Sequence, residues 1–505
     1  MSTLRAARPC GAWREQRARG DAMGSCCSAV RGMETRRGDR ASERKLGALP
    51  DVPYPRRVNI GKRDGLLAVV LVALSLTWSA VAISHGTPLS RYDEWTYVDY
   101  AWKMAHGHIP VQGEDLADET LEAWSCRGME GSIQGVYVPV CGARAEGRDI
   151  EEWPYRGENY NGFHPPLYFA LAGYGGTFLA SHFHTDFVTG ARWISAFLVA
   201  GGVAALYLAL RSWRASRRAA FAGALLALAT PAVGASAGIV HNDAVTLLAG
   251  AAAVWIAARI FLDHRLGSAA PALVMAGIAA TRVISVGALL AVLCAVGCAV
   301  IRPESFGFSL SDRRRLLRLL LVSVLALLLV YLLWSRWQNG RRPEDYVPAI
   351  SGLSTVTLEE GGYDSVLASL LDGYGLTDPR SDFYLQPGVR SGVVKVWAAF
   401  LYLVYLVTPV VAIILLWSRR RHRGLVVATV AGPAVAAVAV QTREIVNSAA
   451  YFRIISGRYA ISTVGLHVAV LALLTDRRGW RDVFLAFAGS GYLLMLGGTL
   501  LTSVG

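Results

Sequence analysis

Two adjacent carboxylates, Asp93 and Glu94, stand in a long polar stretch that follows the first apolar run of the chain. An acidic pair beside a membrane is costly to desolvate, so its presence there suggests use in proton transfer or substrate binding. A structural alternative exists. Ser90 and Asp93 have the spacing of a capping box, in which Asp93 would only close the first turn of a helix expected over residues 93–106.

A second motif in the same stretch is His164, which precedes two prolines. Prolines suit the first turn of a helix, and the residue before them is forced toward extended geometry. The residues just upstream, 155–162, are polar and aromatic, as sugar-binding surfaces often are. The motif therefore indicates either a ligand-contacting histidine or an ordinary helix start with an exposed side chain.

Further polar residues interrupt the apolar runs. His241, Asn242 and Asp243 fill a very short turn, where Asn242 and Asp243 are either substrate contacts or helix caps. Arg282 falls in an apolar region, where an arginine costs about 2.5–3.5 kcal/mol on insertion scales and normally faces a cavity or an anion such as a lipid phosphate. The alternative for Arg282 is a side chain that extends to the membrane surface.

Arg458 and Tyr459 precede one of the last apolar runs. The planar guanidinium of arginine suits phosphate oxygens, although an interfacial anchor would have the same composition. The sequence contains no zinc, iron–sulfur, P-loop or dinucleotide signature. Asp93, Glu94 and Asp243 could hold a divalent cation, but the chemistry requires no cofactor.

The elements that must position these residues are membrane spans. The chain has 505 residues, of which 53% are hydrophobic, and its mean hydropathy is +0.37. Apolar runs of about 20 residues recur, which predicts an all-α integral membrane protein. The net charge of +13 comes from arginines in the N-terminal region and in short loops, a distribution typical of cytosolic segments rather than of nucleic-acid binding.

Eleven spans with a cytosolic N-terminus place every arginine-rich loop inside. The expected spans are residues 66–84, 192–210, 219–240, 243–261, 269–281, 284–301, 316–334, 394–417, 425–441, 459–475 and 483–502.

The domain organisation follows from these spans. Residues 1–64 form a disordered basic cytosolic tail, and residues 65–502 form the transmembrane domain. Two long acidic segments, 85–190 and 335–393, lie outside the cell membrane, and the first contains juxtamembrane helices, including the short apolar run 165–180. Cys126 and Cys141 in the first segment either form a disulfide or remain free thiols.

Together, these motifs and their order resemble the GT-C superfamily of membrane glycosyltransferases, over roughly residues 62–475. The chain is similar to protein O-mannosyltransferases, to lipid A aminoarabinose transferases and to related bacterial membrane proteins. The shared pattern is an acid pair after the first span, a His-Pro-Pro-Leu block, an acid in the second outer turn and a late Gly-Arg-Tyr. Here these are Asp93 and Glu94, residues 164–167, Asp243, and residues 457–459.

The resemblance implies an inverting transfer from a polyprenyl-phosphate sugar to an acceptor hydroxyl of a glycan, lipid or protein at the extracytoplasmic face of the plasma membrane. One base is enough, because a lipid phosphate leaves without a general acid. The implied base is Asp93, with Glu94 orienting the site and Arg282, Arg458 and Tyr459 around the donor phosphate. His164, Asn242 and Asp243 are the implied substrate contacts.

Two other functions fit the same residues. In a transporter or flippase, Arg282 and the outer acids would line a pathway, although the chain shows no paired halves with matching broken segments. In a binding or scaffold protein, the GT-C fold would persist without activity, because fold alone does not fix function.

Overall fold

The computed structural model describes residues 60–90, 93–128, 141, 150, 153–347, 355–357, 392–452, 455 and 457–501. All of them belong to one compact unit, Arg57–Gly505, and only this unit is considered below. Residues 1–59 of the tail expected over residues 1–64 lie outside the described residues. The last three residues of that range, 62–64, belong to the first described helix, which begins at Lys62.

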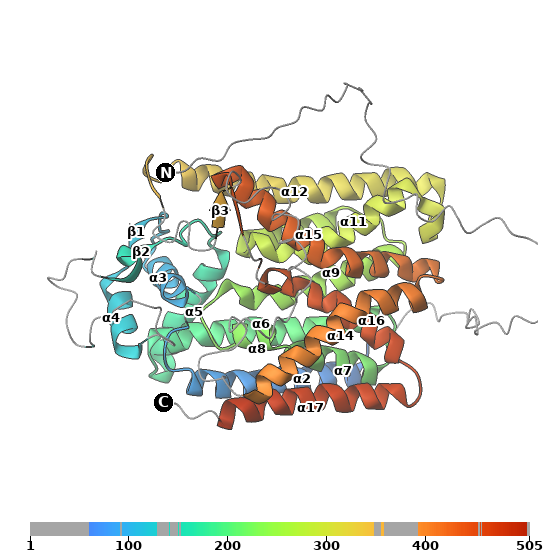
Figure 1. Cartoon of the computed structure of the whole chain (residues 1–505), viewed down its shortest axis with the longest axis horizontal. Helices are drawn as coiled ribbons and strands as arrows, with labels where there is room; N and C mark the ends of the chain where they lie inside the picture. Colours follow the sequence, from blue (N-terminus) through green and yellow to red (C-terminus); the bar gives the residue numbers. More distant parts are fainter. Residues whose placement is uncertain are drawn as a thin grey trace, which may run out of the picture. The chain divides into compact units, whose positions relative to one another are not determined.

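The described part of this unit is almost entirely helical (Figure 1). Its α-helices are α2 Lys62–His85, α3 Glu94–Ala105, α4 Asp118–Arg127, α5 Leu167–Phe183, α6 Phe187–Ser212, α7 Arg217–Leu228, α8 Pro231–Ser236, α9 Thr246–Phe261, α10 Ala269–Thr281, α11 Gly287–Ile301, α12 Arg313–Asn339, α14 Gly392–Leu416, α15 Arg423–Ser448, α16 Val464–Thr475 and α17 Trp480–Leu501.

Short 3-10 helices and two antiparallel strand pairs complete the described structure. The 3-10 helices are η3 Pro154–Gly157, η4 Asn242–Val245, η5 Val283–Val286, η6 Pro303–Phe306, η7 Leu310–Asp312, η9 Arg420–His422 and η10 Gly457–Thr463. The strands are β1 Glu114–Asp115, which pairs with β2 Glu158–Asn159, and β3 Thr355–Thr357, which pairs with β4 Ala450–Phe452.

Nine helical segments within the described ranges are long and apolar enough to cross a membrane. This agrees with an all-α, multi-pass membrane protein, and the count of eleven spans stays a prediction. The two expected spans outside the nine are 219–240 and 269–281. Helix α10 covers the second of these with only 13 residues, which makes it short for a full crossing.

The other expected span, 219–240, is broken into α7 and α8. Thr230 has extended backbone angles, φ −76° and ψ 119°, and Pro231 begins α8. Proline lacks an N–H and disfavours a helical residue before it, so the chain turns at this point instead of continuing as one helix. The break shortens α7 to 12 residues.

The polar segment 85–190 contributes helices that do not belong to the nine. Helices α3 and α4 and the β1–β2 pair gather at one end of the long helices (Figure 1). Helix α5 covers the run expected to lie along the membrane surface and packs against both α3 and α6. We call the end that carries α3, α4 and the β1–β2 pair the site end.

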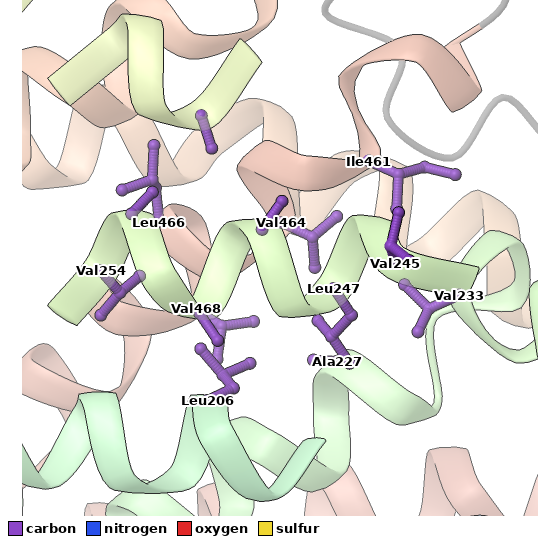
Figure 2. Packing of buried hydrophobic residues seen from close by; sticks show 14 of the residues in the cluster. Leu206, Ala227, Val233, Val245, Leu247, Val254, Ile461, Val464, Leu466 and Val468 are labelled. Atoms are coloured by element: carbon purple, nitrogen blue, oxygen red, sulfur yellow. The ribbon is translucent and has the colours of Figure 1, made fainter. Parts of the chain in front are cut away.

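Helix α9 lies at the centre of the core, between α6 and α16 (Figure 2). Leu247 and Val254 on α9 are buried, as are Leu206 on α6 and Val468 on α16. Gly250 allows the closest approach, because a Cβ there would lie 2.4 Å from the carbonyl oxygen of Ser462. This contact fixes η4 and η10, which lead into α9 and α16 and carry candidate functional residues.

Candidate functional site

The candidate residues meet around Tyr97, which lies one turn into α3. Tyr97 is 3% exposed, and its ring packs edge-on against His241, with the two ring centres 4.5 Å apart. Its hydroxyl lies 3.3 Å from Nε2 of His164. Asp93, Arg282, Arg458 and Tyr459 are all within electrostatic range of this hydroxyl. Tyr97 thus brings together motifs that are far apart in the sequence.

Asp93 precedes α3 in a left-handed backbone conformation, with φ 61° and ψ 14°. Its side chain makes no capping hydrogen bond, so the capping alternative is wrong for Asp93. Instead, Oδ1 accepts a hydrogen bond of 2.7 Å from the hydroxyl of Tyr160. A non-glycine residue in this conformation is strained, and such strain concentrates at functional positions.

Burial raises the pKa of Asp93, while Arg458, Tyr160 and Asn161 oppose this by favouring the charged form. A carboxylate with a raised pKa is a stronger base than an exposed aspartate. Asp93 is therefore equipped to accept a proton from a bound hydroxyl group.

The segment that carries Tyr160 is tied to α3 by amide side chains. Asn159 Nδ2 donates to the carbonyl oxygen of Thr96 at 3.0 Å and to Asp99 Oδ2 at 2.8 Å. Asn161 Nδ2 donates to Oγ1 of Thr96 at 2.8 Å. These bonds hold the Tyr160 hydroxyl against Asp93.

Glu94 forms a buried ion pair with Arg192 of α6. Nε and one terminal nitrogen of Arg192 donate to the two Glu94 oxygens, each at 2.8 Å. The same carboxylate accepts the backbone N–H of Ser90 at 2.6 Å and that of Val240 at 2.8 Å. Glu94 is thus saturated by protein donors, an arrangement suited to orienting the site rather than to proton transfer.

His164 lies at the start of the α5 segment, beside Tyr97. Its carbonyl oxygen accepts a hydrogen bond of 2.9 Å from the Tyr100 hydroxyl. Burial lowers the pKa of His164 well below its ordinary value, and Arg282, Arg443 and Arg458 lower it further. A histidine in these surroundings stays neutral, so it can exchange hydrogen bonds with a ligand without adding charge.

Asp243 joins His241 to Arg282. A terminal nitrogen of Arg282 forms an ion pair with Asp243 Oδ1, and Oδ2 lies 3.1 Å from His241 Nδ1. The side chain that caps η4 belongs to His241, so the expected cap by Asn242 or Asp243 is wrong. Arg282 is 3% exposed and extended between α10 and η5, so it does not reach the surface of the protein.

Asn242 is fully buried next to this group, and neither its amide nitrogen nor its amide oxygen has a hydrogen-bond partner among the described residues. Arg458 and Tyr459 enter from η10, where the Arg458 guanidinium lies 5.4 Å from the centre of the Tyr459 ring. Arg458 is also within electrostatic range of Asp93, His164 and His241.

The end of α12 is fastened to the segment that leads into His164. Trp334 Nε1 donates to the carbonyl oxygen of Phe163 at 2.8 Å. The buried amide of Gln338 donates to the carbonyl oxygens of Gly162, at 2.7 Å, and Pro110, at 3.1 Å. The start of the expected loop 335–393 therefore borders the site, and most of the rest of that loop lies outside the described residues.

The possible cation ligands Asp93, Glu94 and Asp243 can be compared with their surroundings in the described ranges. No group of three His, Cys, Asp or Glu side chains there could hold an ion. Glu94 and Asp243, two of the three possible ligands, are paired with Arg192 and Arg282 instead. The arrangement does not fit a divalent cation held by Asp93, Glu94 and Asp243.

Four residues at this end were not predicted as site residues: Tyr97, Tyr160, Arg192 and His241. Only two had a visible signal in the sequence. His241 adjoins the predicted contacts Asn242 and Asp243, and Tyr160 belongs to the polar and aromatic run before His164. Tyr97 lies in an ordinary amphipathic helix, and Arg192 lies at the start of an apolar run.

The structure also joins Cys126 to Cys141 in a disulfide, which decides between the two alternatives for that pair. Comparisons of the chain with protein-family models, with curated proteins and with solved structures found no match.

Proposed function

We propose that the protein is a membrane glycosyltransferase of the GT-C type, which moves a sugar from a polyprenyl-phosphate donor to an acceptor hydroxyl at the extracytoplasmic face of the plasma membrane. The observation that carries the proposal is Asp93. Its backbone is in the left-handed conformation, and its carboxylate serves no capping role and lies within electrostatic range of Arg458. The resemblance of the motifs to GT-C enzymes supports the same function.

The reaction would need one base and one anion-binding group. Asp93 would take the proton of the acceptor hydroxyl as its oxygen bonds to the anomeric carbon on the face opposite the phosphate. The bond between that carbon and the phosphate oxygen would break, and polyprenyl phosphate would leave with the electron pair. Arg282 and Arg458 would stabilise the charge on the leaving phosphate. Glu94, held by Arg192, would orient the neighbouring Asp93.

The remaining predicted residues would contact the substrates. His164 is neutral and borders Tyr97, so it would contact the donor or the acceptor without repelling the arginines. Tyr459 and Asn242 would complete the donor and substrate contacts, with the Asn242 amide supplying both a donor and an acceptor.

The decisive experiment compares a strain that lacks the protein with strains complemented by wild type, by Asp93→Asn and by Asp482→Asn. Asparagine tolerates the left-handed conformation of Asp93, so this substitution removes the base with little backbone cost. Asp482 forms an exposed ion pair with Arg218 and is the matched acid-to-amide control. Lipid-linked sugars and envelope glycans are measured by mass spectrometry.

We expect the deleted strain to accumulate a polyprenyl-phosphate sugar and to lose one glycan. Wild type and Asp482→Asn should restore the glycan, whereas Asp93→Asn should transfer at least about a hundred-fold more slowly. An unchanged glycan profile, or equal rescue by Asp93→Asn at equal protein level, would contradict the proposal and favour a transporter or an inactive binding protein.

A further inference from the structure

We infer that His241 is a further ligand-contacting residue of this site, which donates a hydrogen bond from Nε2 to a phosphate oxygen, and that Asp243 is the residue that positions it. The inference rests on the proposed function for its ligand, a lipid-linked phosphate. It goes beyond the predicted contacts, which include Asn242 and Asp243 but not His241.

The hydrogen-bond network assigns the proton of the His241 ring. The backbone N–H of Asp243 donates to Nδ1 at 2.9 Å. A main-chain N–H can only donate, so Nδ1 is the accepting nitrogen, and the proton of the neutral ring is on Nε2. His241 is thereby held as an N–H donor directed away from η4.

The surroundings keep this ring neutral. His241 is fully buried, and burial lowers its pKa well below the ordinary value. The positive charges of Arg282 and Arg458 act in the same direction. The carboxylate of Asp243 opposes them from 3.1 Å but already forms an ion pair with Arg282. A neutral donor beside arginines adds a hydrogen bond to an anion without adding repulsion between cations.

Besides the Asn242 amide, Nε2 of His241 and Nε of Arg282 are buried N–H groups of this cluster with no partner among the described residues. The side chains of His241 and Arg282 are only 1% and 4% exposed. Leaving a buried donor unsatisfied costs about 1–3 kcal/mol, so unmet donors at one place indicate a ligand with acceptor oxygens. Both groups only donate, and phosphate oxygens only accept and carry charge, which makes phosphate the best match.

Asp243 explains how the two donors are held together. One of its oxygens binds Arg282 and the other lies against His241, while its backbone N–H fixes the histidine ring. All the contacts of Asp243 named here are to protein groups. The carboxylate of Asp243 therefore positions Arg282, and its backbone N–H positions His241, so Asp243 does not need to touch the ligand.

The test uses two variants that separate ligand binding from capping. In His241→Gln the side-chain amide reaches the place of Nε2 and keeps a donor there, but it lacks the acceptor at the place of Nδ1. In His241→Asn the shorter amide keeps that acceptor, and Asn is a good helix cap, but it has no donor at Nε2. The full chain in nanodiscs is titrated with a polyprenyl monophosphate and with the uncharged polyprenol.

We expect His241→Asn to weaken binding of the phosphate by about ten- to a hundred-fold, the loss of one hydrogen bond to a charged group. His241→Gln should keep most of the affinity yet unfold at a lower temperature than His241→Asn. Polyprenol should bind all three proteins equally. If Gln binds the phosphate more tightly than Asn but Asn gives the more stable protein, His241 contacts the ligand in addition to capping η4.

The assignment of His241 is overturned if both variants bind the phosphate like wild type. It is also overturned if His241→Gln binds the phosphate more weakly than His241→Asn, so that affinity changes in the same order as stability. A wild-type protein that does not prefer the phosphate over polyprenol would overturn the proposed lipid-phosphate substrate, and this assignment with it. The wild-type measurement therefore distinguishes failure of the function from failure of the residue assignment.

Discussion

At the scale of single residues, the environment of Asp93 sets the pH range in which it would act as a base. Burial raises its pKa above the ordinary value of 3.8, and the Tyr160 hydroxyl holds the pKa back by binding the charged form. A base must be deprotonated to accept a proton, so activity is present above the Asp93 pKa and is lost as the pH falls through it.

We therefore predict that Tyr160→Phe raises the Asp93 pKa further and moves the acidic limb of the pH–rate profile upward by about one pH unit. Initial rates of sugar transfer, measured against pH in detergent or nanodiscs, would test this. Tyr174→Phe is the control, because Tyr174 is 57% exposed on α5. A limb that stays in place, or moves to lower pH, would show that Tyr160 does not act through Asp93.

At the scale of elements, Glu94 and Arg192 join four parts of the site end. Glu94 begins α3, and Arg192 lies in α6 and also donates to the carbonyl oxygens of Gly86 and Pro88. The bond from the Val240 backbone N–H to Glu94 adds the chain that leads into η4. A buried ion pair with this many partners holds α3 and the His241 segment in place.

Removing one partner of this ion pair should strongly destabilise the protein, because the remaining charge stays buried without its counter-charge. We expect Arg192→Met to destabilise the protein by about 3–5 kcal/mol. The matched control is Arg218→Met, which breaks the exposed 2.9 Å pair with Asp482 and should cost less than about 1 kcal/mol. Thermal unfolding in detergent gives both values, and similar losses for the two variants would contradict a structural role for Arg192.

The contact between α9 and η10 makes a second prediction at this scale. Gly250→Ala would place a Cβ 2.4 Å from the Ser462 carbonyl oxygen, which only a backbone shift can relieve. We expect a loss of about 1–3 kcal/mol and weaker binding of polyprenyl phosphate, because η10 carries Arg458. Gly277→Ala on α10 meets no atom within 4 Å and should leave stability unchanged or raised. Equal stability of the two variants would show that the packing is looser than described.

At the scale of the whole molecule, the proposed orientation places the site end outside the cell. The Cys126–Cys141 disulfide belongs to this end, and disulfides persist in oxidising compartments. The arginine-rich loop before α7 would lie in the cytosol. The orientation follows from charge and from the proposed function, so it calls for a direct test.

We predict that, after mild reduction of intact cells, a membrane-impermeant maleimide labels Cys126 and Cys141 but not a cysteine introduced as Ser216→Cys. Cys294 and Cys298 are exposed on α11 and should stay unlabelled, because this helix is long and apolar enough to cross the membrane and lipid would cover its exposed face. Lysed cells, in which Ser216→Cys becomes labelled, are the control. Labelling of Ser216→Cys in intact cells would reverse the orientation. The test uses a chain in which the other native cysteines, Cys10, Cys26 and Cys27, are replaced by serine.

The sequence by itself determined the class of this protein. Hydropathy over about 20 residues is a local property, so the all-α membrane architecture and most of the apolar helices could be read directly. Order and spacing of the polar motifs also pointed to one group of residues, and Asp93, His164, Asp243, Arg282 and Arg458 do lie around Tyr97.

Only the tertiary structure decided the partners and roles of these residues. Glu94 is buried against Arg192, which is 98 residues away in the chain. The side chain of His241, rather than that of Asn242 or Asp243, caps η4, and the side chain of Asp93 makes no capping bond. Ion pairs, unmet donors and backbone strain arise where distant segments pack together. A pattern of neighbouring residue types therefore indicates which groups are polar and buried, but only the packing fixes which of them remain for a ligand.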